Sequence, residues 1–312
     1  MDGLRIRAYE AADAGAVAAL VNAVFAAGGV RADHSAAEIE ELVEHEIRDP
    51  ATDTRLVVDA DGRLAAAAFV PAPPDGGYRL ELIGGVLPER RGAGIGRALL
   101  AWQLERAASL RAEVAPDSAW TGQVVTGVPD ASAIRLYERL GFAPARYFLK
   151  MVAPVPPASG AAVPEGVRLM RYTQSLERDV HALHSSAFRG LWGHQERAFE
   201  PWAAQTVRSE RFLPDLARVA FAGDAIVGYV LPYSQDEPGR LYVGQIGTAE
   251  SWRRRGVAGA LLADMLAAAA GPGYTAAALD ADADNPTGAA AVYLRAGFKI
   301  DQHLVAYTRA VS

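Results

Sequence analysis

The sequence predicts a mixed α/β fold, with α and β elements around a mixed sheet, in which one structural unit is built twice in tandem. Strand and helix patterns follow the same order in two halves of similar length. An Arg–Gly–aliphatic phrase stands at the same place in each half, as "ERRGAGIGRALL" at 89–100 and "WRRRGVAGALL" at 252–262. A Pro- and Gly-rich stretch at 153–166 separates the halves and is typical of a linker. We therefore expect domains at 1–152 and 167–312.

Composition limits the class of protein. A chain of 312 residues, 51% hydrophobic and 22% charged, is long enough for two packed domains of roughly 100–200 residues each. The net charge is −6 without a basic tail, which argues against nucleic-acid binding. No apolar run of about 18 residues and no signal-peptide core is found, so we expect a cytoplasmic protein without a membrane partner. The lack of cysteine excludes disulfides, thiolate metal sites and an acyl-cysteine intermediate.

Alternating apolar residues and turn signals locate the strands. Asp–Gly at 61–62 and Gly–Asp at 223–224 indicate two hairpins. Strands, including the two hairpin pairs, are expected at 4–9, 55–70, 78–86, 119–125 and 142–152, and again at 167–172, 217–231, 240–248, 274–282 and 298–308.

Helical periodicity fills the gaps between these strands. Helices are expected at 14–25 and 177–188, after each Arg–Gly phrase, and before each Gly–Phe pair. The second half also contains a longer insert with helical character at 192–212, where an acceptor-binding helix would fit.

The Arg–Gly phrase indicates an anion site. Its two copies share the spacing R-x-x-G-x-G/A, with Arg91, Gly94 and Gly96 matching Arg253, Gly256 and Ala258. A helix begins with unpaired N–H groups and partial positive charge, and glycine lets a phosphate approach the backbone. The phrase is neither a Walker A loop nor the dinucleotide G-x-G-x-x-G. An ordinary glycine-rich helix start is the alternative, which two copies in matching context disfavour.

Both halves resemble the GNAT superfamily of N-acetyltransferases, whose acyl-CoA pyrophosphate loop reads [Q/R]-x-x-G-x-[G/A]. A second signature agrees: "DASAIRLYERLGF" (130–142) and "NPTGAAAVYLRAGF" (285–298) resemble the family's N-x-x-A-x-x-L-Y-x-x-x-G-F stretch. The resemblance covers nearly the whole chain and predicts two GNAT acyl-CoA N-acyltransferase domains in tandem. Asp130 departs from it by replacing Asn, and Asn285 stands one residue further from its tyrosine than Asp130 does.

The resemblance implies acetyl-CoA as cosubstrate, without a metal. The cosubstrate would lie between the strand before each loop and the strand after the following helix. Its contacts would be Val86, Arg91, Gly92, Gly94, Ile95 and Gly96 in the first half, and Ile246, Arg253, Arg254, Arg255, Gly256, Val257, Ala258, Asn285 and Tyr293 in the second. A small-molecule primary amine would attack the thioester directly in a ternary complex. That step needs a neutral amine, oxyanion stabilisation by backbone N–H groups and a proton for the departing thiolate.

Three residues are candidates for proton transfer. Tyr137 and Tyr293 each precede Gly–Phe by the same interval and would be general acids, although each also fits the buried face of an amphipathic helix. Glu81 would be the base, or hold a water, unless it is only an outward-facing strand residue. The second half offers no equivalent acid, because Val243 stands at the matching position and Gln245 is the nearest polar residue. Its base would then be a water or the substrate itself.

Other signals carry less weight. "DADADN" (280–285) lacks the Gly and Glu of an EF-hand loop and fits alternating Asp at a strand end. His181 and His184 share a helix face without a third metal ligand nearby. Aromatic residues of the insert region would line an acceptor pocket or pack in a core; they are Phe188, Trp192, Phe199 and Trp202.

Two functions of different classes remain at this point. One is a tandem acetyltransferase, with the C-terminal domain as the favoured catalyst by resemblance. The other is an acyl-CoA sensor or scaffold in which one or both domains are silent. The protein would be a monomer, with the domains forming an intrachain pseudo-dimer, or a homodimer.

Overall fold

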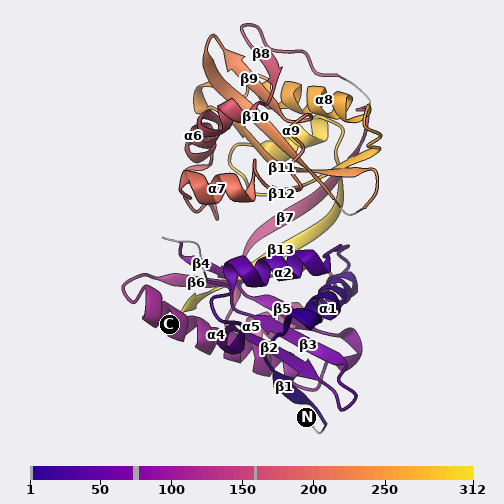
Figure 1. The fold of residues 1–312 in the computed structure, drawn as a ribbon, viewed down its shortest axis with the longest axis vertical. Coiled ribbons are helices and arrows are strands. Elements are labelled where there is room, and N and C mark those ends of the chain that lie inside the picture. Colours follow the sequence, from indigo (N-terminus) through magenta and orange to yellow (C-terminus); the bar gives the residue numbers. More distant parts are fainter. Residues whose placement is uncertain (1–2, 73–76, 158–159, 236) are drawn as a thin grey trace. The chain divides into compact units, whose positions relative to one another are not determined.

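The computed structural model describes residues 3–72, 77–157, 160–235 and 237–312 (Figure 1). Two compact units make up the chain. Unit 1 comprises Met1–Tyr147 together with His303–Ser312, and unit 2 comprises Phe148–Gln302. Each unit therefore contains the closing strand of the other repeat. The boundaries at 152 and 167 describe repeats along the sequence and stay a prediction, whereas the compact units are defined by contacts.

Unit 1 is built from two groups of strands. The first is an antiparallel sheet in the order β1 (Arg5–Arg7), β2 (Thr54–Val58), β3 (Leu64–Phe69) and β5 (Ile83–Val86). In the second, β4 (Arg79–Glu81) pairs in parallel with β6 (Trp120–Gly127), which pairs antiparallel with β13 (Lys299–Val311). The helices are α1 (Ala14–Ala27), α2 (Ala36–Glu46), α3 (Pro50–Asp53), α4 (Ile95–Val114) and α5 (Ala131–Arg139). In Figure 1 the yellow strand β13 lies among the indigo and magenta elements of this unit.

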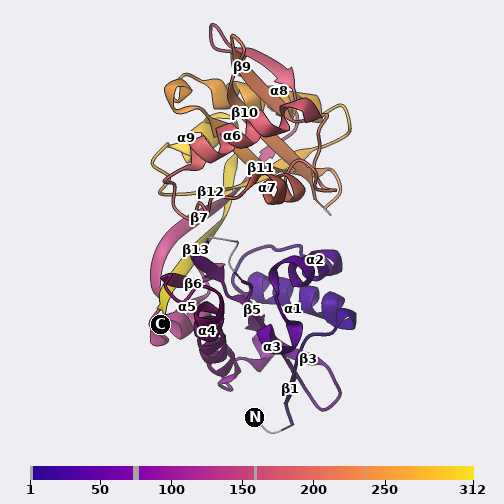
Figure 2. The ribbon, with the colours of Figure 1, turned by 60° about the vertical axis from the view of Figure 1, so that its left-hand side comes forward.

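Unit 2 has one sheet and four helices. The strand order is β8 (Arg168–Arg171), β9 (Arg218–Ala222), β10 (Ala225–Ser234), β11 (Arg240–Thr248), β12 (Ala276–Asp282) and β7 (Ala143–Pro154). Only the β11–β12 pair of these neighbours is parallel. The helices are α6 (Glu177–Phe188), α7 (Phe199–Gln205), α8 (Val257–Ala269) and α9 (Ala289–Arg295). Figure 2 shows α6 on one face of this sheet, with α8 and α9 on the other.

The alternation of side chains along each hairpin explains how helices cover both faces. In unit 1, Leu56 and Phe69 pack with α1 on one face, whereas Val57 and Ala68 pack with α4 on the other. Unit 2 repeats the pattern: Val219 and Tyr229 lie in the cluster with α6 and α7, and Ala220 and Val230 lie in the cluster with α8. These strands are buried on both faces, which is why their sequences are almost continuously apolar.

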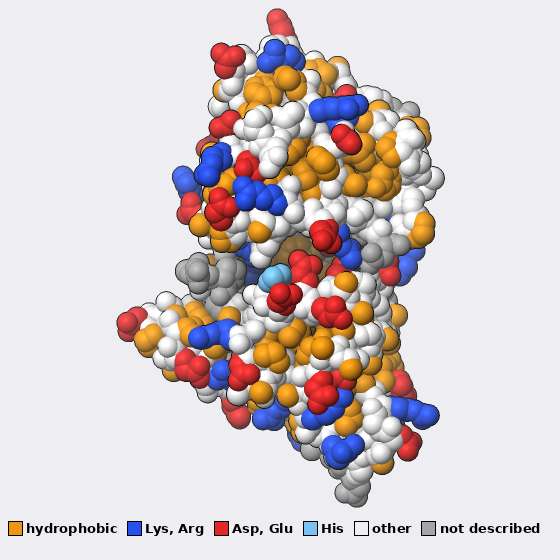
Figure 3. All heavy atoms as spheres, viewed as in Figure 1, with side chains coloured by type: hydrophobic (Ala, Val, Ile, Leu, Met, Phe, Trp, Pro, Cys, Tyr) orange, Lys and Arg blue, Asp and Glu red, His pale blue; other side chains and the backbone are white. Residues whose placement is uncertain are grey.

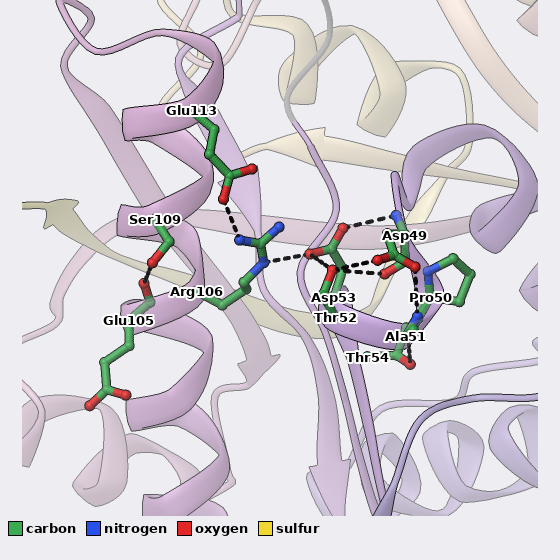
Figure 4. A network of polar contacts seen from close by, with 10 residues as sticks. All are labelled: Asp49, Pro50, Ala51, Thr52, Asp53, Thr54, Glu105, Arg106, Ser109 and Glu113. Atoms are coloured by element: carbon green, nitrogen blue, oxygen red, sulfur yellow. Dashed lines mark hydrogen bonds and ion pairs between the residues drawn. The ribbon is translucent and has the colours of Figure 1, made fainter.

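An ion pair joins the helix that follows each Arg–Gly phrase to residues at or beside the hairpin. In unit 1, Arg106 of α4 donates to the fully buried carboxylate of Asp53 at 2.6 Å, and the backbone N–H of Asp49 donates to the same carboxylate (Figure 4). In unit 2 the charges are reversed, because Arg218 of β9 donates to Asp264 of α8 at 2.5 Å. Breaking a pair as buried as Arg106–Asp53 costs about 3–5 kcal/mol. The Arg218–Asp264 pair contributes less, because the Asp264 side chain is 48% exposed.

The strand before each Arg–Gly phrase leaves its parallel neighbour after three residue pairs. In unit 1 the pairing of β4 with β6 ends at Glu81, and the chain continues as β5 beside β3. Gly84 makes this crossing possible, since a Cβ there would lie 2.2 Å from the carbonyl oxygen of Ala67. In unit 2 the pairing of β11 with β12 ends at Tyr242, and β11 continues beside β10. Both units therefore separate the strand before the loop from the strand after the helix.

Most expected elements are present, with three differences. The strand expected at 78–86 is split into β4 and β5 by the crossing just described. The insert at 192–212 is helical only over Phe199–Gln205. The helices α2 and α3 were not expected, although Ser35 and Glu38 form a reciprocal capping box that marks the start of α2.

Because the closing strands are exchanged, a core substitution in one of them should destabilise the unit that contains this strand, and not the unit formed by the rest of its own repeat. Val305 lies in the second repeat but is buried in unit 1, and Met151 lies in the first repeat but is buried in unit 2. We expect Val305→Ala and Met151→Ala each to cost about 2 kcal/mol in the unit that buries it. Hydrogen exchange should then show faster exchange in β6 for Val305→Ala and in β12 for Met151→Ala. Faster exchange confined to the residue's own repeat would contradict the exchanged arrangement.

Candidate active site

The two Arg–Gly loops follow the same backbone path. A single 3-10 turn precedes each, at Pro88–Arg90 and Glu250–Trp252. The next residue is extended in both, with φ −70° at Arg91 and φ −63° at Arg253. The residue that starts each helix is a left-handed glycine, Gly94 at φ 80° and Gly256 at φ 90°. The repeated sequence phrase therefore encodes a repeated conformation, which counts against a chance helix start.

Both helix starts are open to an anion. No side chain caps the first turn of α4 or α8. Ile95 and Val257 are buried and anchor the two helices. A Cβ at Gly94 would meet only the tip of the Arg97 side chain, at 4.0 Å, and one at Gly256 only the ring of Pro164, at 3.6 Å. The unpaired N–H groups of the first turn and the helix dipole are thus available to a phosphate in each unit.

The residue after the first arginine distinguishes the loops. Gly92 has φ 86°, and its counterpart Arg254 has φ 60°, the one non-glycine residue with positive φ in the described part of the chain. A left-handed conformation costs a non-glycine residue roughly 1–2 kcal/mol. The loop of unit 2 keeps an arginine there despite this cost, and Arg255 follows it. Both side chains are exposed, so unit 2 offers two more cationic groups to an anion than the Gly92–Ala93 pair does.

The first arginine of each loop has different partners. In unit 1 a terminal guanidinium nitrogen of Arg91 lies 3.3 Å from the carboxylate of Asp130, which also caps α5 by accepting from the backbone N–H groups of Ser132 and Ala133. In unit 2 Arg253 donates instead to the carbonyl of Ala187 at the end of α6, at 2.9 Å. A nearly buried negative charge therefore neutralises the first loop, and among the described residues no carboxylate forms an ion pair with Arg253 in the second.

In the sequence, Asn285 of the second repeat corresponds to Asp130 of the first. Its side-chain oxygen accepts hydrogen bonds from the backbone N–H and the hydroxyl of Thr287, at 2.9 and 2.7 Å. It brings no charge. The change from Asp130 in the first repeat to Asn285 in the second therefore removes a negative charge from beside the loop.

The two tyrosines occupy equivalent positions. The ring of each lies 6.2 Å from the phenylalanine that follows it, Phe142 for Tyr137 and Phe298 for Tyr293. Burial raises the pKa of Tyr293 to about 12, and burial together with the charge of Asp130 raises the pKa of Tyr137 well above its usual value. Within the described residues neither hydroxyl has a hydrogen-bond partner. Both phenols therefore stay protonated at neutral pH and are free to donate.

Glu81 stands at the end of the parallel pairing in unit 1. Its side chain reaches solvent, but the protein atoms around it reduce its hydration and raise the pKa of its carboxyl group, which the charge of Arg79 opposes. A raised pKa of this origin is common in catalytic carboxylates.

The match proposed for Glu81 in the second half was wrong. Strand register places Tyr242, not Val243, at the end of the parallel pairing in unit 2. The reason is a bulge: Leu231 pairs with Gln245 and Pro232 pairs with Val243, so Gly244 is an extra residue that shifts the count by one. Val243 points into the core beneath α8.

One acidic residue near the second loop was missed. Asp280 of β12 lies close enough to Tyr242 for each side chain to influence the pKa of the other. Its sequence signal was the "DADADN" run, which was interpreted only as alternating Asp at a strand end. That interpretation is correct for the strand, which ends at Asp282, but spacing alone did not pair Asp280 with a tyrosine of another strand.

The aromatic residues of the insert region differ in what they contact. Trp202 is buried in the core with α6, as the packing alternative expected. Trp192 contacts Phe148 of β7, with ring centres 5.9 Å apart. Phe188 stacks on His184 at 4.5 Å, and Nδ1 of His184 lies 2.8 Å from the hydroxyl of the buried Tyr229.

His184 is uncharged at neutral pH, because burial lowers its pKa to about 4. In the described ranges no three His, Asp or Glu residues are grouped so as to hold a metal ion. The same ranges contain no helix with the length and apolarity needed to cross a membrane. Figure 3 shows acidic and basic side chains interspersed over the face in view.

Comparison with known proteins agrees with this geometry. Residues 178–298 match the family model described as the acetyltransferase (GNAT) family, and residues 52–144 match an acetyltransferase (GNAT) domain model. A mycothiol acetyltransferase of Clavibacter michiganensis subsp. michiganensis is 32% identical over 268 residues, which are 82% of this chain and 79% of the relative.

Solved structures show the same fold. A GCN5-related N-acetyltransferase from Sphaerobacter thermophilus has 30% identity and a TM-score of 0.85, covering 100% of this chain and 96% of its own. A tandem GNAT protein from the clavulanic acid biosynthesis pathway has 20% identity and a TM-score of 0.70, covering 99% of each chain. The expected fold of two GNAT domains in a mixed α/β arrangement is confirmed.

The strained Arg254 yields a test that separates conformation from charge. We expect Arg254→Gly to weaken acetyl-CoA binding about tenfold by removing a cation, while raising the free energy of unfolding by about 0.5–1 kcal/mol through relief of strain. Arg254→Ala is the matched control, since it removes the same charge but keeps the strain. Calorimetric titration and chemical denaturation measure the two effects. Equal stability of the two variants would show that Arg254 is not strained.

Proposed function

Because this chain belongs to the GNAT family of acetyltransferases, we propose that unit 2 transfers the acetyl group of acetyl-CoA to a primary amine of a small molecule. The observation that carries the choice of unit is the charge around the two loops. Unit 2 combines three arginines and an uncapped helix start with the neutral Asn285, whereas Asp130 neutralises Arg91 in unit 1. A pyrophosphate is therefore better stabilised on residues 253–258 than on residues 91–96.

The course of the strands supports a position for the rest of the cosubstrate. Beyond Tyr242 the edge of β11 no longer pairs with β12, so an extended pantetheine arm would lie along residues 243–248, beside Ile246. The bulged Gly244 lies at the start of this stretch and has no partner across in β10. Its backbone N–H is our candidate for stabilising the oxyanion.

Transfer would proceed by direct attack within a ternary complex. The amine nitrogen forms a bond to the thioester carbon, the carbonyl oxygen takes the negative charge, and the C–S bond then breaks. Tyr293 would give its proton to the departing thiolate, for which a phenol with a pKa of about 12 is in the correct protonation state. The amine loses its proton to a base as the amide forms. Acetyl-CoA is consumed as a cosubstrate, and this route assigns no step to a metal.

Unit 1 supports a second candidate function. It retains Glu81, Tyr137 and the full glycine loop, but a buried carboxylate stands beside its anion site. We propose that this unit binds acyl-CoA more weakly and without turnover, as a sensor or scaffold for unit 2. A cytoplasmic location, and a monomeric or homodimeric state, remain predictions. The name of the Clavibacter relative makes mycothiol acetyltransferase activity the first to assay.

Blocking each loop in turn tests which unit works. We expect Gly256→Glu to abolish acetyl transfer, because it places a carboxylate where the pyrophosphate would bind, and Gly94→Glu to leave turnover within about threefold. Calorimetry with acetyl-CoA should show the tighter site lost only in Gly256→Glu. Both glycines have positive φ, so Gly256→Ala and Gly94→Ala serve as controls for backbone strain. Retained activity in Gly256→Glu would overturn the choice of unit 2.

Removing the two phenols tests the general acid. Tyr293→Phe should lower kcat about 100-fold or more without changing acetyl-CoA affinity, whereas Tyr137→Phe should have little effect on turnover. The raised pKa of Tyr293 adds a condition on pH. Since the phenol stays protonated until the pH approaches 12, kcat of the native protein should show no alkaline fall below about pH 11 from this group. A fall centred near pH 9 that disappears in Tyr293→Phe would contradict the raised pKa.

A further inference from the structure

Strand alternation places Asp280 on the opposite face of the unit 2 sheet from α8. Leu279 and its neighbours Ala277 and Ala281 point into the core beneath α8, so Asp280 points to the other face. The same rule applies to β11, where Leu241 and Val243 are buried against α8 and Tyr242 between them faces the other way. Asp280 and Tyr242 thus lie on one face, on neighbouring strands.

Asp280 also lies at the point where the strands separate. The last parallel pair joins Tyr242 to Ala278, and Asp280 is the next residue of β12 on that face. It therefore borders the gap along which the cosubstrate is proposed to lie. Glu81 borders the corresponding gap in unit 1, but from the strand on the opposite side, β4.

The groups around Asp280 influence the charge of its carboxyl group. Its side chain is exposed to solvent and lies on the same face as Tyr242, whose hydroxyl lowers the pKa of Asp280. Lys150 of β7 stands directly across from it in the antiparallel pairing, and Arg240 of β11 also acts on its charge. Reduced hydration raises the pKa of Asp280, and the charges of Lys150 and Arg240 partly oppose this rise.

An aromatic pair borders the same region. Phe148 lies two residues before Lys150 on β7 and pairs with Asp282, which places it diagonally from Asp280 on the same face. Trp192, from the segment after α6, packs against Phe148. A carboxylate beside two aromatic rings is a surface that fits an amine attached to a flat apolar or sugar-ring skeleton.

We propose that Asp280 holds the acceptor amine of unit 2 and takes its proton, that Tyr242 positions the Asp280 carboxylate, and that the acceptor is a primary amine on a ring-shaped skeleton. This inference rests on the proposed function. The proton balance is complete: the amine proton passes to Asp280 as the C–N bond forms, and the thiolate receives its proton from Tyr293. The second repeat thus has its own catalytic carboxylate, which lies on β12 rather than on the strand before the loop.

The test compares Asp280→Asn with Asp282→Asn in the full chain. Asp282 is the matched control, because it lies on the same face two residues further on. The probes are acetyl-CoA with glucosamine, cyclohexylamine or spermidine as acceptor. We expect Asp280→Asn to lower kcat/KM for the ring amines at least 100-fold with unchanged acetyl-CoA affinity by calorimetry, and Asp282→Asn to stay within threefold. Spermidine, which has no ring, should be the poorest acceptor.

Tyr242→Phe tests the positioning role with a readout other than rate. The Tyr242 hydroxyl stabilises the charged carboxylate, so its removal should raise the pKa of Asp280 and move the acidic limb of the kcat/KM profile to higher pH. A merely structural role would lower the rate without moving that limb.

The outcomes are distinguishable. If Asp280→Asn transfers acetyl as well as the native protein, the inference is overturned and the proposed function stands. If the native protein binds acetyl-CoA but acetylates none of these amines and shows no mycothiol acetyltransferase activity, the proposed function is overturned and the inference falls with it.

Discussion

The early end of the parallel pairing is the constraint on which the rest of this structure depends. Only three residue pairs join β11 to β12, and only three join β4 to β6, before the strands separate. A longer ladder would close the sheet and leave no unpaired backbone edge between the loop and the following strand. Because the strand that separates runs directly into the Arg–Gly loop, the same crossing that opens the gap also directs the helix start toward it.

Backbone conformation at a few positions enforces this separation. In unit 1 the crossing needs Gly84, where any side chain would collide with the neighbouring strand. Unit 2 reaches the same result by a bulge at Gly244. The bulge at Gly244 adds one residue to unit 2 relative to unit 1. As a result, Tyr242 of β11, and not Val243, corresponds to Glu81 of β4. The two repeats thus share a backbone plan while differing in the chemistry that each presents.

Because the closing strands are exchanged, neither unit can complete its core without a strand from the other repeat. The aromatic ring of Tyr137, in the first repeat, lies 5.8 Å from Tyr307, in the last strand of the chain. The tyrosine of unit 1 is therefore positioned by a segment more than 150 residues away, and β7 contributes in the same way to unit 2. Long-range pairing of this kind delays the completion of each core until most of the chain is present.

The sequence by itself determined the local features. Glycine spacing specified both loops because left-handed φ values strongly favour glycine, and apolar alternation specified the hairpins because their strands are buried on both faces. The tandem order, the two tyrosine helices and the mixed α/β class followed from the same local rules. Three features could be seen only in the tertiary structure: which strand closes which unit, where the bulge shifts the register, and which carboxylate borders the second gap. They depend on contacts between residues far apart along the chain, and the period of a single strand contains no information about its partner.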